Sequence, residues 1–176
     1  MDMELPLTAA DLASATLPDA LPVDAGPRAL ARLIEYAPGR QVALPPHTTI
    51  ELLENPAVVT VPGAAYYACG LLAWQGRQLP LLDLHALLRA YPGVNSAAPP
   101  RYALVLAYQR APRQPVEHGA ISLAVLPQTV TVTDKAGCEL PADSDLWPLL
   151  ALSCFLHQGH AVPILDTARL FAAYHG

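Results

Sequence analysis

The stretch QGRQLPLLD, from Gln75 to Asp83, recurs almost unchanged as QGHAVPILD, from Gln158 to Asp166. Gln, Gly, Pro, Leu and Asp occupy matching positions, and the residues on either side of the proline are apolar in both copies. The offset is 83 residues, from Gln75 to Gln158. Beyond the match, Leu87-Leu88 in the first copy corresponds to Leu170-Phe171 in the second. We therefore predict two related lobes.

Each copy is typical of a tight turn, a strand and a short helix in succession. Gly76, like its counterpart in the second copy, supplies the positive φ that a two-residue hairpin turn requires. Pro80 and Pro163 cannot donate a ladder hydrogen bond, so each is expected in an edge strand or at a bulge. Asp83 and Asp166 stand where an aspartate accepts N–H bonds from a following helical turn. Each lobe is therefore predicted to be a small barrel sealed by a short helix.

Short β segments separated by Gly and Pro dominate the rest of the chain, which predicts a mainly β fold. RALARLIEY and QVAL flank the turn APGR, and RYALVLAY and GAISLAVL flank the polar insert QRAPRQPVEH. HTTIELLEN is expected to be a strand that gives way to a helical turn. Residues 58–61 are expected to form a short strand, and TVTVTD an alternating one.

Composition limits the size and setting of the protein. The 176 residues suit one domain or two small lobes that share an interface, and 53% of them are apolar. The longest near-apolar stretch, from Leu146 to Leu156, is 11 residues, whereas a bilayer needs about 20, so no membrane insertion is expected. The first residues carry acids where a secretory signal would carry bases, which favours a cytoplasmic protein. Three widely spaced cysteines indicate reduced thiols.

Charge divides the chain at residue 27. Residues 1–27 hold five acids and no base, which accounts for the whole net charge of −5, and they contain prolines typical of an extended tail. Residues 28–176 balance ten acids with ten bases, and we expect them to form the folded domain. Because Lys135 is the single lysine, the chain lacks the basic clusters of nucleic-acid-binding proteins.

Two catalytic or metal-binding interpretations are weaker than structural ones. Asp83 and Asp166 in related halves suggest an aspartic-protease-like pair, and ILDTA resembles the loop of such enzymes, but the first copy lacks its Thr and Gly. Helix capping is the simpler role. Cys154, His157 and His160 are closely spaced, but no fourth metal ligand is evident. No catalytic or phosphate-binding motif is present in the sequence, so we expect neither an enzyme, a metal nor a cofactor.

The segment VTVPGAAYYACGLLAWQGRQLPLLDLHALL, from Val59 to Leu88, resembles the signature of CheW-like domains, the chemotaxis coupling proteins. GAISLAVLPQTVTV and SCFLHQGHAVPILDTARLF resemble later strands and the final helix of that family, so the resemblance covers residues 28–173. It implies two interlocked five-stranded SH3-like barrels. It also implies a non-catalytic adaptor between the regulatory domain of a CheA-type histidine kinase and the cytoplasmic tips of chemoreceptors.

The chain departs from the family pattern at its first hairpin. The family has N-L-R-G, with an arginine associated with receptor contact, where this chain has Ala73-Trp74-Gln75-Gly76. His85 stands where the family often has an arginine. These differences indicate a divergent member, with a changed receptor partner or a role in another pathway such as surface motility.

An adaptor needs an exposed apolar surface, and the first copy offers candidates. The predicted partner-binding residues are Val59, Val61, Pro62, Gly63, Gly70, Leu72, Trp74, Gln75 and Gly76. Trp74 is either an exposed anchor beside the hairpin tip or packed across the strand pair. Trp147 is expected in the core. The alternative function is a generic SH3-like module that binds one peptide or small ligand.

Overall fold

The computed structural model describes residues 26–89 and 99–172. Most of the predicted acidic tail, residues 1–25, lies outside the described residues, as does the end of the chain from residue 173. Among the described residues, no helix has the length and apolar character needed to cross a bilayer.

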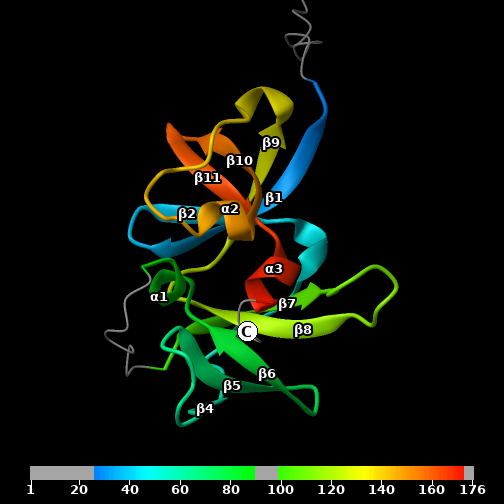
Figure 1. Ribbon diagram of the computed structural model, residues 1–176, viewed down its shortest axis with the longest axis vertical. Helices are drawn as coiled ribbons and strands as arrows, with labels where there is room; N and C mark the ends of the chain where they lie inside the picture. Colours follow the sequence, from blue (N-terminus) through cyan, green and yellow to red (C-terminus); the bar gives the residue numbers. More distant parts are fainter. Residues whose placement is uncertain (1–25, 90–98, 173–176) are drawn as a thin grey trace, which may run out of the picture.

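Two β-sheets contain all the strands of the described chain (Figure 1). The five-stranded sheet has the order β10-β11-β2-β1-β9, and the six-stranded sheet has the order β3-β7-β8-β6-β5-β4. The first comprises β1 (Arg28–Ala37), β2 (Arg40–Leu44), β9 (Gln128–Thr133), β10 (Ala151–His157) and β11 (His160–Leu165). The second comprises β3 (Thr49–Glu54), β4 (Val58–Val59), β5 (Ala68–Trp74), β6 (Arg77–Leu82), β7 (Tyr102–Tyr108) and β8 (Glu117–Leu123). The helices are α1 (Leu84–Arg89), α2 (Trp147–Leu150) and α3 (Thr167–Ala172), with 3-10 turns η1 (Pro46–Thr48) and η2 (Asp134–Ala136).

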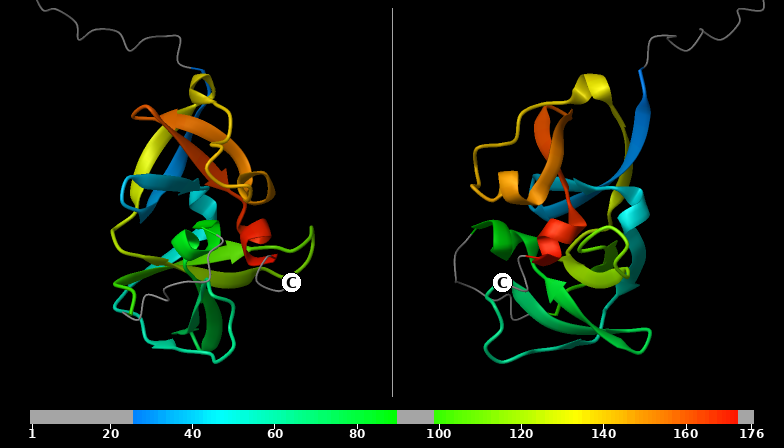
Figure 2. Two further views of the ribbon diagram at one scale, coloured as in Figure 1. Left: turned by 60° about the vertical axis from the view of Figure 1, so that its left-hand side comes forward. Right: turned by 45° about the vertical axis from the view of Figure 1, so that its right-hand side comes forward.

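The two lobes are interlocked because the chain crosses between them twice. It begins in one sheet with β1 and β2, builds the whole of the other from β3 to β8, and returns to the first with β9 to β11. Figure 2 shows the two lobes stacked along the long axis, with helices at their junction. The predicted pair of lobes is confirmed, and the two copies of the repeat lie in different sheets.

Both lobes share one topology. In the order β9-β1-β2-β11-β10, the four successive pairings are antiparallel, antiparallel, parallel and antiparallel. The order β3-β7-β8-β6-β5 has the same four pairings in the same sequence. Closure is also shared, because Val58 of β4 pairs with Leu72 and Gly137 pairs with Phe155. Leu72 and Phe155 are again 83 residues apart. In each lobe, the segment that follows the first strand of the order, β3 or β9, thus pairs with the last strand, β5 or β10. This pairing closes each sheet into a barrel, as predicted for SH3-like barrels.

The repeated prolines lie in interior strands, so the expectation of edge strands is wrong. β6 pairs with β5 and β8, and β11 pairs with β10 and β2. The parallel ladder in β6 joins Leu81 and Leu82, directly after Pro80, and the ladder in β11 joins Ile164, directly after Pro163. Each proline lies within an antiparallel ladder, opposite Leu71 or Cys154, and before the first paired residue of its parallel ladder. The register irregularity falls in the partner strand, β5 or β10.

Three apolar clusters stabilise the fold, and the largest lies between the lobes. The barrel interiors hold smaller clusters, one around Leu72 and Leu81 and one around Leu33 and Phe155. The central cluster combines residues of both sheets and all three helices: Ile34, Val42, Leu44, Leu82, Leu84, Leu87, Leu104, Leu106, Ile121, Trp147, Leu150, Leu165, Leu170 and Phe171. The helices therefore seal the junction of the lobes, and not each its own barrel as predicted. Trp147 is buried, as predicted.

Local predictions were mostly correct. The hairpins β1–β2 and β7–β8 form as expected, and Gly39 supplies the positive φ of the first turn. The order around β3 is the reverse of the prediction, because the 3-10 turn η1 precedes the strand and contains Pro46. The expected strand over residues 58–61 ends at Val59.

Candidate partner-binding site

The first repeated turn presents Gln75 and Gly76 to solvent. Their φ values are 46° and 74°, and the corresponding values at Gln158 and Gly159 are 49° and 79°. A two-residue turn with positive φ at both positions matches the right-handed twist of the flanking strands. In each turn, both the glutamine and the glycine therefore have positive φ. From the sequence, positive φ was expected for the glycine alone.

Trp74 precedes this turn and faces the barrel interior, so the exposed-anchor interpretation is wrong. Its side chain is 8% exposed, and Nε1 donates a 2.7 Å hydrogen bond to Oε2 of Glu51 in β3. Its ring centroid lies 4.9 Å from that of His118 in β8. Trp74 thus joins β5 to β3 and β8, and stabilises the interior of this barrel.

Two further predicted contact residues are also buried. Leu72 belongs to the barrel core. Gly70 has a φ of 142°, and a Cβ placed there would lie 2.3 Å from the carbonyl oxygen of Val59. Gly70 therefore lets β4 approach β5 closely, and any effect of these residues on a partner would be indirect.

The other predicted residues of this segment form a continuous exposed ridge, which we call the closing-strand surface: Val59, Val61, Pro62 and Gly63. Val59 is 62% exposed, whereas its neighbour Val58 packs toward the barrel core, as alternation in a strand requires. Gly63 turns the chain with a φ of 75°. Because β4 ends the strand order, one backbone edge lies beside these apolar side chains.

A second apolar surface, which we call the β3 groove, was missed by sequence reasoning. Its cavity of about 300 Å³ is lined by Arg32, Thr49, Ile50, Glu51, Leu52, Leu104, Leu126 and Pro127. Ile50 is 45% exposed and Leu126 is 56% exposed. The surface was missed because a helical turn was expected within this segment. The alternation Ile50-Glu51-Leu52 could instead have indicated a strand with outward apolar residues.

Charged groups in the β3 groove are held in place. Glu51 accepts the indole bond of Trp74, and Arg32 Nη1 donates a 2.9 Å bond to Oγ1 of Thr129. The groove thus combines apolar side chains with an oriented carboxylate and guanidinium. Glu51 connects the groove to the residue before the first turn, because its hydrogen-bond partner Trp74 directly precedes Gln75.

Asp83 and Asp166 begin helices, as predicted. Oδ1 of Asp83 accepts N–H bonds from residues 85 and 86 at 2.8 and 3.1 Å. Oδ1 of Asp166 accepts N–H bonds from residues 168 and 169 at 2.9 and 3.3 Å. Each carboxylate is committed to its own helix, and the two follow strands of different sheets, so the geometry gives no support to a protease-like pair.

The cysteine nearest the second repeat has a thiol partner. Cys154 Sγ lies 3.3 Å from Cys138 Sγ, and burial raises the pKa of Cys154 to about 12. Within residues 26–89 and 99–172, no group of three or more His, Cys, Asp or Glu side chains is placed to hold a metal ion.

Comparisons with known proteins agree with this architecture. The family model of the CheW-like domain matches residues 34–174. Among solved structures, the fold is similar to that in the crystal structure of the scaffolding protein TtCheW from Thermoanaerobacter tengcongensis, with a TM-score of 0.63 at 8% sequence identity. The match covers 80% of this chain and 90% of that one, and at this identity it concerns the fold alone. No curated protein sequence matches the chain.

Proposed function

The chain belongs to the family of CheW-like domains, and from that premise we propose that it is a non-catalytic adaptor in a chemotaxis-like or surface-motility pathway. It couples the regulatory domain of a CheA-type histidine kinase to the cytoplasmic tips of chemoreceptors, and therefore works in the cytoplasm. The observation that carries the proposal is that the chain exposes two distinct surfaces with apolar side chains, the closing-strand surface and the β3 groove, which also receives Arg32 from β1 of the other lobe.

Two surfaces suit an adaptor because it must hold two partners at once. Exposed apolar side chains beside a strand edge provide both the hydrophobic contact and the backbone groups that partner docking uses. We assign the kinase domain to the closing-strand surface and the receptor tip to the β3 groove. Glu51 of the groove is hydrogen-bonded to Trp74, the residue before Gln75, where the family pattern places its receptor-associated arginine.

Gln75 is the informative position for the receptor contact. An arginine there would offer charge-assisted, bidentate bonds that glutamine cannot, worth about 1–3 kcal/mol at a desolvated contact. Gln75→Arg is therefore expected to strengthen binding to a standard receptor fragment and to leave kinase binding unchanged. Gln158→Arg is the matched control, because it changes the same turn, at the same positive φ, in the other lobe.

The two surfaces are separated by charge substitutions at exposed apolar positions. Leu126→Asp is expected to weaken receptor binding alone, and Val59→Asp to weaken kinase binding alone, both measured by calorimetry with purified fragments. Loss of both partners from either variant would contradict the two-surface assignment. Binding of one peptide ligand and of neither partner would favour the generic SH3-like module.

A further inference from the structure

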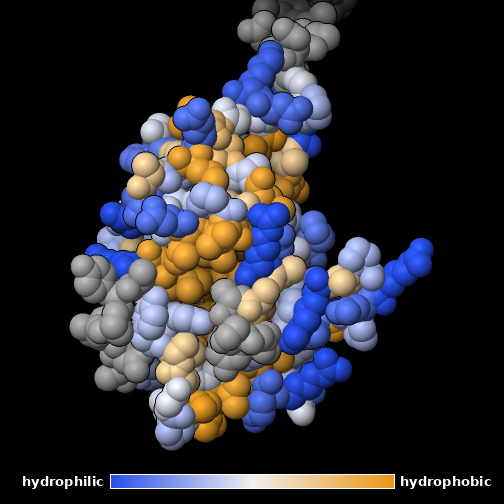
Figure 3. Space-filling view, in the orientation of Figure 1, coloured by the Kyte–Doolittle hydropathy of each residue, from blue (hydrophilic) through white to orange (hydrophobic). Residues whose placement is uncertain are grey.

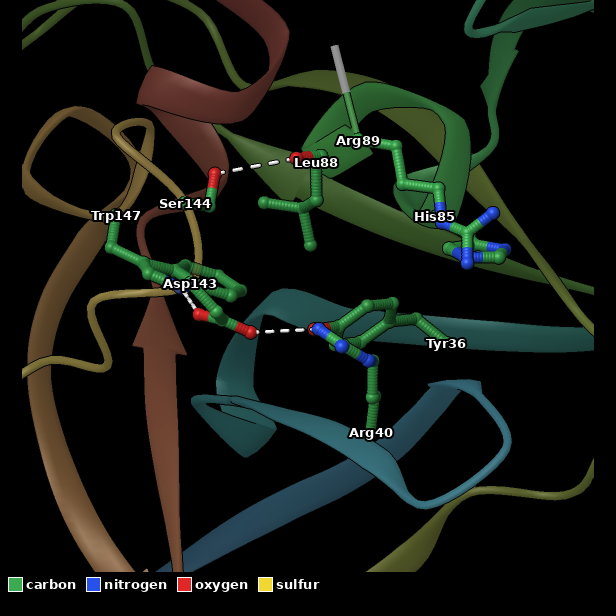
Figure 4. Close-up of a pocket in the computed structure, with 8 residues that line it drawn as sticks. All are labelled: Tyr36, Arg40, His85, Leu88, Arg89, Asp143, Ser144 and Trp147. Carbon is green, nitrogen blue, oxygen red and sulfur yellow. Dashed lines mark hydrogen bonds and ion pairs between the residues drawn. The ribbon is translucent and has the colours of Figure 1, made fainter. Parts of the chain in front are cut away.

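Another cavity lies at the junction of the lobes and shares no lining residue with either proposed partner surface. It has a volume of about 290 Å³ and receives residues from β1, the start of β2, α1 and the segment that leads into α2 (Figure 4). The lining residues are Tyr36, Arg40, His85, Leu88, Arg89, Asp143, Ser144 and Trp147. Since α1 follows the strands of one barrel and β1, β2 and α2 belong to the other, only the assembled junction forms this cavity.

One wall of the cavity is fixed by a hydrogen-bonded network around Asp143. Its Oδ2 accepts a 2.8 Å bond from Nη1 of Arg40, and its Oδ1 accepts a 2.7 Å bond from Nε1 of Trp147. Burial raises the pKa of the nearby Tyr36 hydroxyl, which bonds to Arg40. Both oxygens of the single carboxylate are therefore engaged, and its charge is matched by one guanidinium.

The opposite wall carries the guanidinium of Arg89 and the imidazole of His85, neither of which is bonded to Asp143. His85 and Arg89 lie four residues apart on α1, so their side chains leave the same face of the helix. In Figure 4 the Arg89 guanidinium lies beside the His85 ring at the cavity. Within the described residues, neither side chain forms a hydrogen bond or ion pair with a carboxylate, and the lining carries one positive charge more than negative.

We propose that this junction cavity binds a small organic anion, a molecule with a carboxylate or phosphate group on an apolar body. Arg89 and His85 would donate to the anionic group, since a guanidinium fork matches the oxygens of either one. Tyr36, whose ring centroid lies 6.4 Å from that of His85, would contact the apolar part. Figure 3 shows an apolar surface over α2, the helix that supplies Trp147 to the cavity wall.

A purely structural role explains only part of the arrangement. A basic residue in the last turn of a helix interacts favourably with the helix carbonyl groups, which accounts for Arg89. It does not account for His85, which stands in the first turn of the same helix, or for the cavity that both side chains line. His85 and Arg89 therefore face a space that a ligand can fill.

The proposal is tested on the full chain with four probes. Phenyl phosphate and benzoate carry the two anionic groups, inorganic phosphate lacks the apolar body, and benzyl alcohol lacks the charge. We expect saturable binding of phenyl phosphate or benzoate by calorimetry, weaker binding of inorganic phosphate, and none of benzyl alcohol. The comparison of the first two probes identifies the preferred anionic group.

Variants locate the site. Arg89→Gln and His85→Gln should each weaken binding roughly 10- to 100-fold, as expected for loss of a bond to a charged group. Arg28→Gln makes the same charge change at the exposed start of β1 and should leave binding unchanged. Thermal melts verify folding of each variant. Absence of saturable binding by all three anions, or an equal loss in Arg28→Gln, would overturn the proposal, whereas the adaptor role would stand or fall on partner binding alone.

Discussion

Replacing either of the repeated aspartates, Asp83 or Asp166, should lower the free energy of unfolding by a predictable amount, because each begins a helix that carries core residues. α1 places Leu84 and Leu87 in the central cluster, and α3 places Leu170 and Phe171 there. Replacing either aspartate by alanine removes two N–H acceptor contacts at the start of a six-residue helix. Neither helix can unwind at that end without disturbing the interior between the lobes.

The expected loss follows from these contacts. An N-cap lost to alanine costs about 1 kcal/mol, with a range of roughly 0.5–2 kcal/mol, and loss of a negative charge at the helix start adds about 0.3–1 kcal/mol. Asp83→Ala and Asp166→Ala should each lower the free energy of unfolding by about 1–2 kcal/mol. The half-exposed ion pair of Asp166 with Arg169, at 3.3 Å, should add less than about 0.5 kcal/mol.

Urea unfolding followed by circular dichroism measures these losses as midpoint shifts at constant slope. Asparagine caps about as well as aspartate, so Asp83→Asn and Asp166→Asn should restore most of the loss and serve as matched controls. The double alanine variant should show the sum within about 0.5 kcal/mol, because each carboxylate bonds only to its own helix and the two share no hydrogen-bond partner. Equal losses for asparagine and alanine, or no loss for alanine, would refute the capping argument.

Three further predictions concern the interior. Gly119→Ala should cost about 1–3 kcal/mol in urea unfolding, because its Cβ would lie 2.2 Å from the buried Phe171 ring, whereas Gly137→Ala, with 3.3 Å to its nearest atom, should cost far less. Burial and a neighbouring positive charge lower the pKa of His118 from 6.5, so the unfolded chain binds its proton more readily. Stability should therefore be complete above pH 6.5 and fall as the pH drops below it, and His118→Gln should flatten this dependence; an unchanged profile would contradict the assignment. Since burial raises the pKa of Cys154 to about 12, iodoacetamide at pH 8 should modify it at least about a hundredfold more slowly in the folded chain than in urea, and equal rates by mass spectrometry would show that the thiol is accessible.

The sequence by itself determined the features that depend on neighbouring residues. The two Gln-Gly turns, the strands that follow them and the caps at Asp83 and Asp166 were predicted because a two-residue turn and an N-cap involve residues within three positions of each other. The repeat with an offset of 83 residues predicted two lobes for the same reason, since each copy folds locally into the same hairpin and helix.

Only the tertiary structure decided which side chains remain available to a partner. The sequence left Trp74 as either an exposed anchor or a residue packed across the strand pair, and its contacts with Glu51 and His118, distant in sequence, show that it is packed inside. The prolines lie in interior strands because the parallel ladders begin after them, which no local pattern encodes. The junction cavity joins Arg40, His85 and Asp143 from three distant segments. Such contacts depend on how the lobes interlock, and burial, unlike a turn or a cap, depends on residues that only the complete fold brings together.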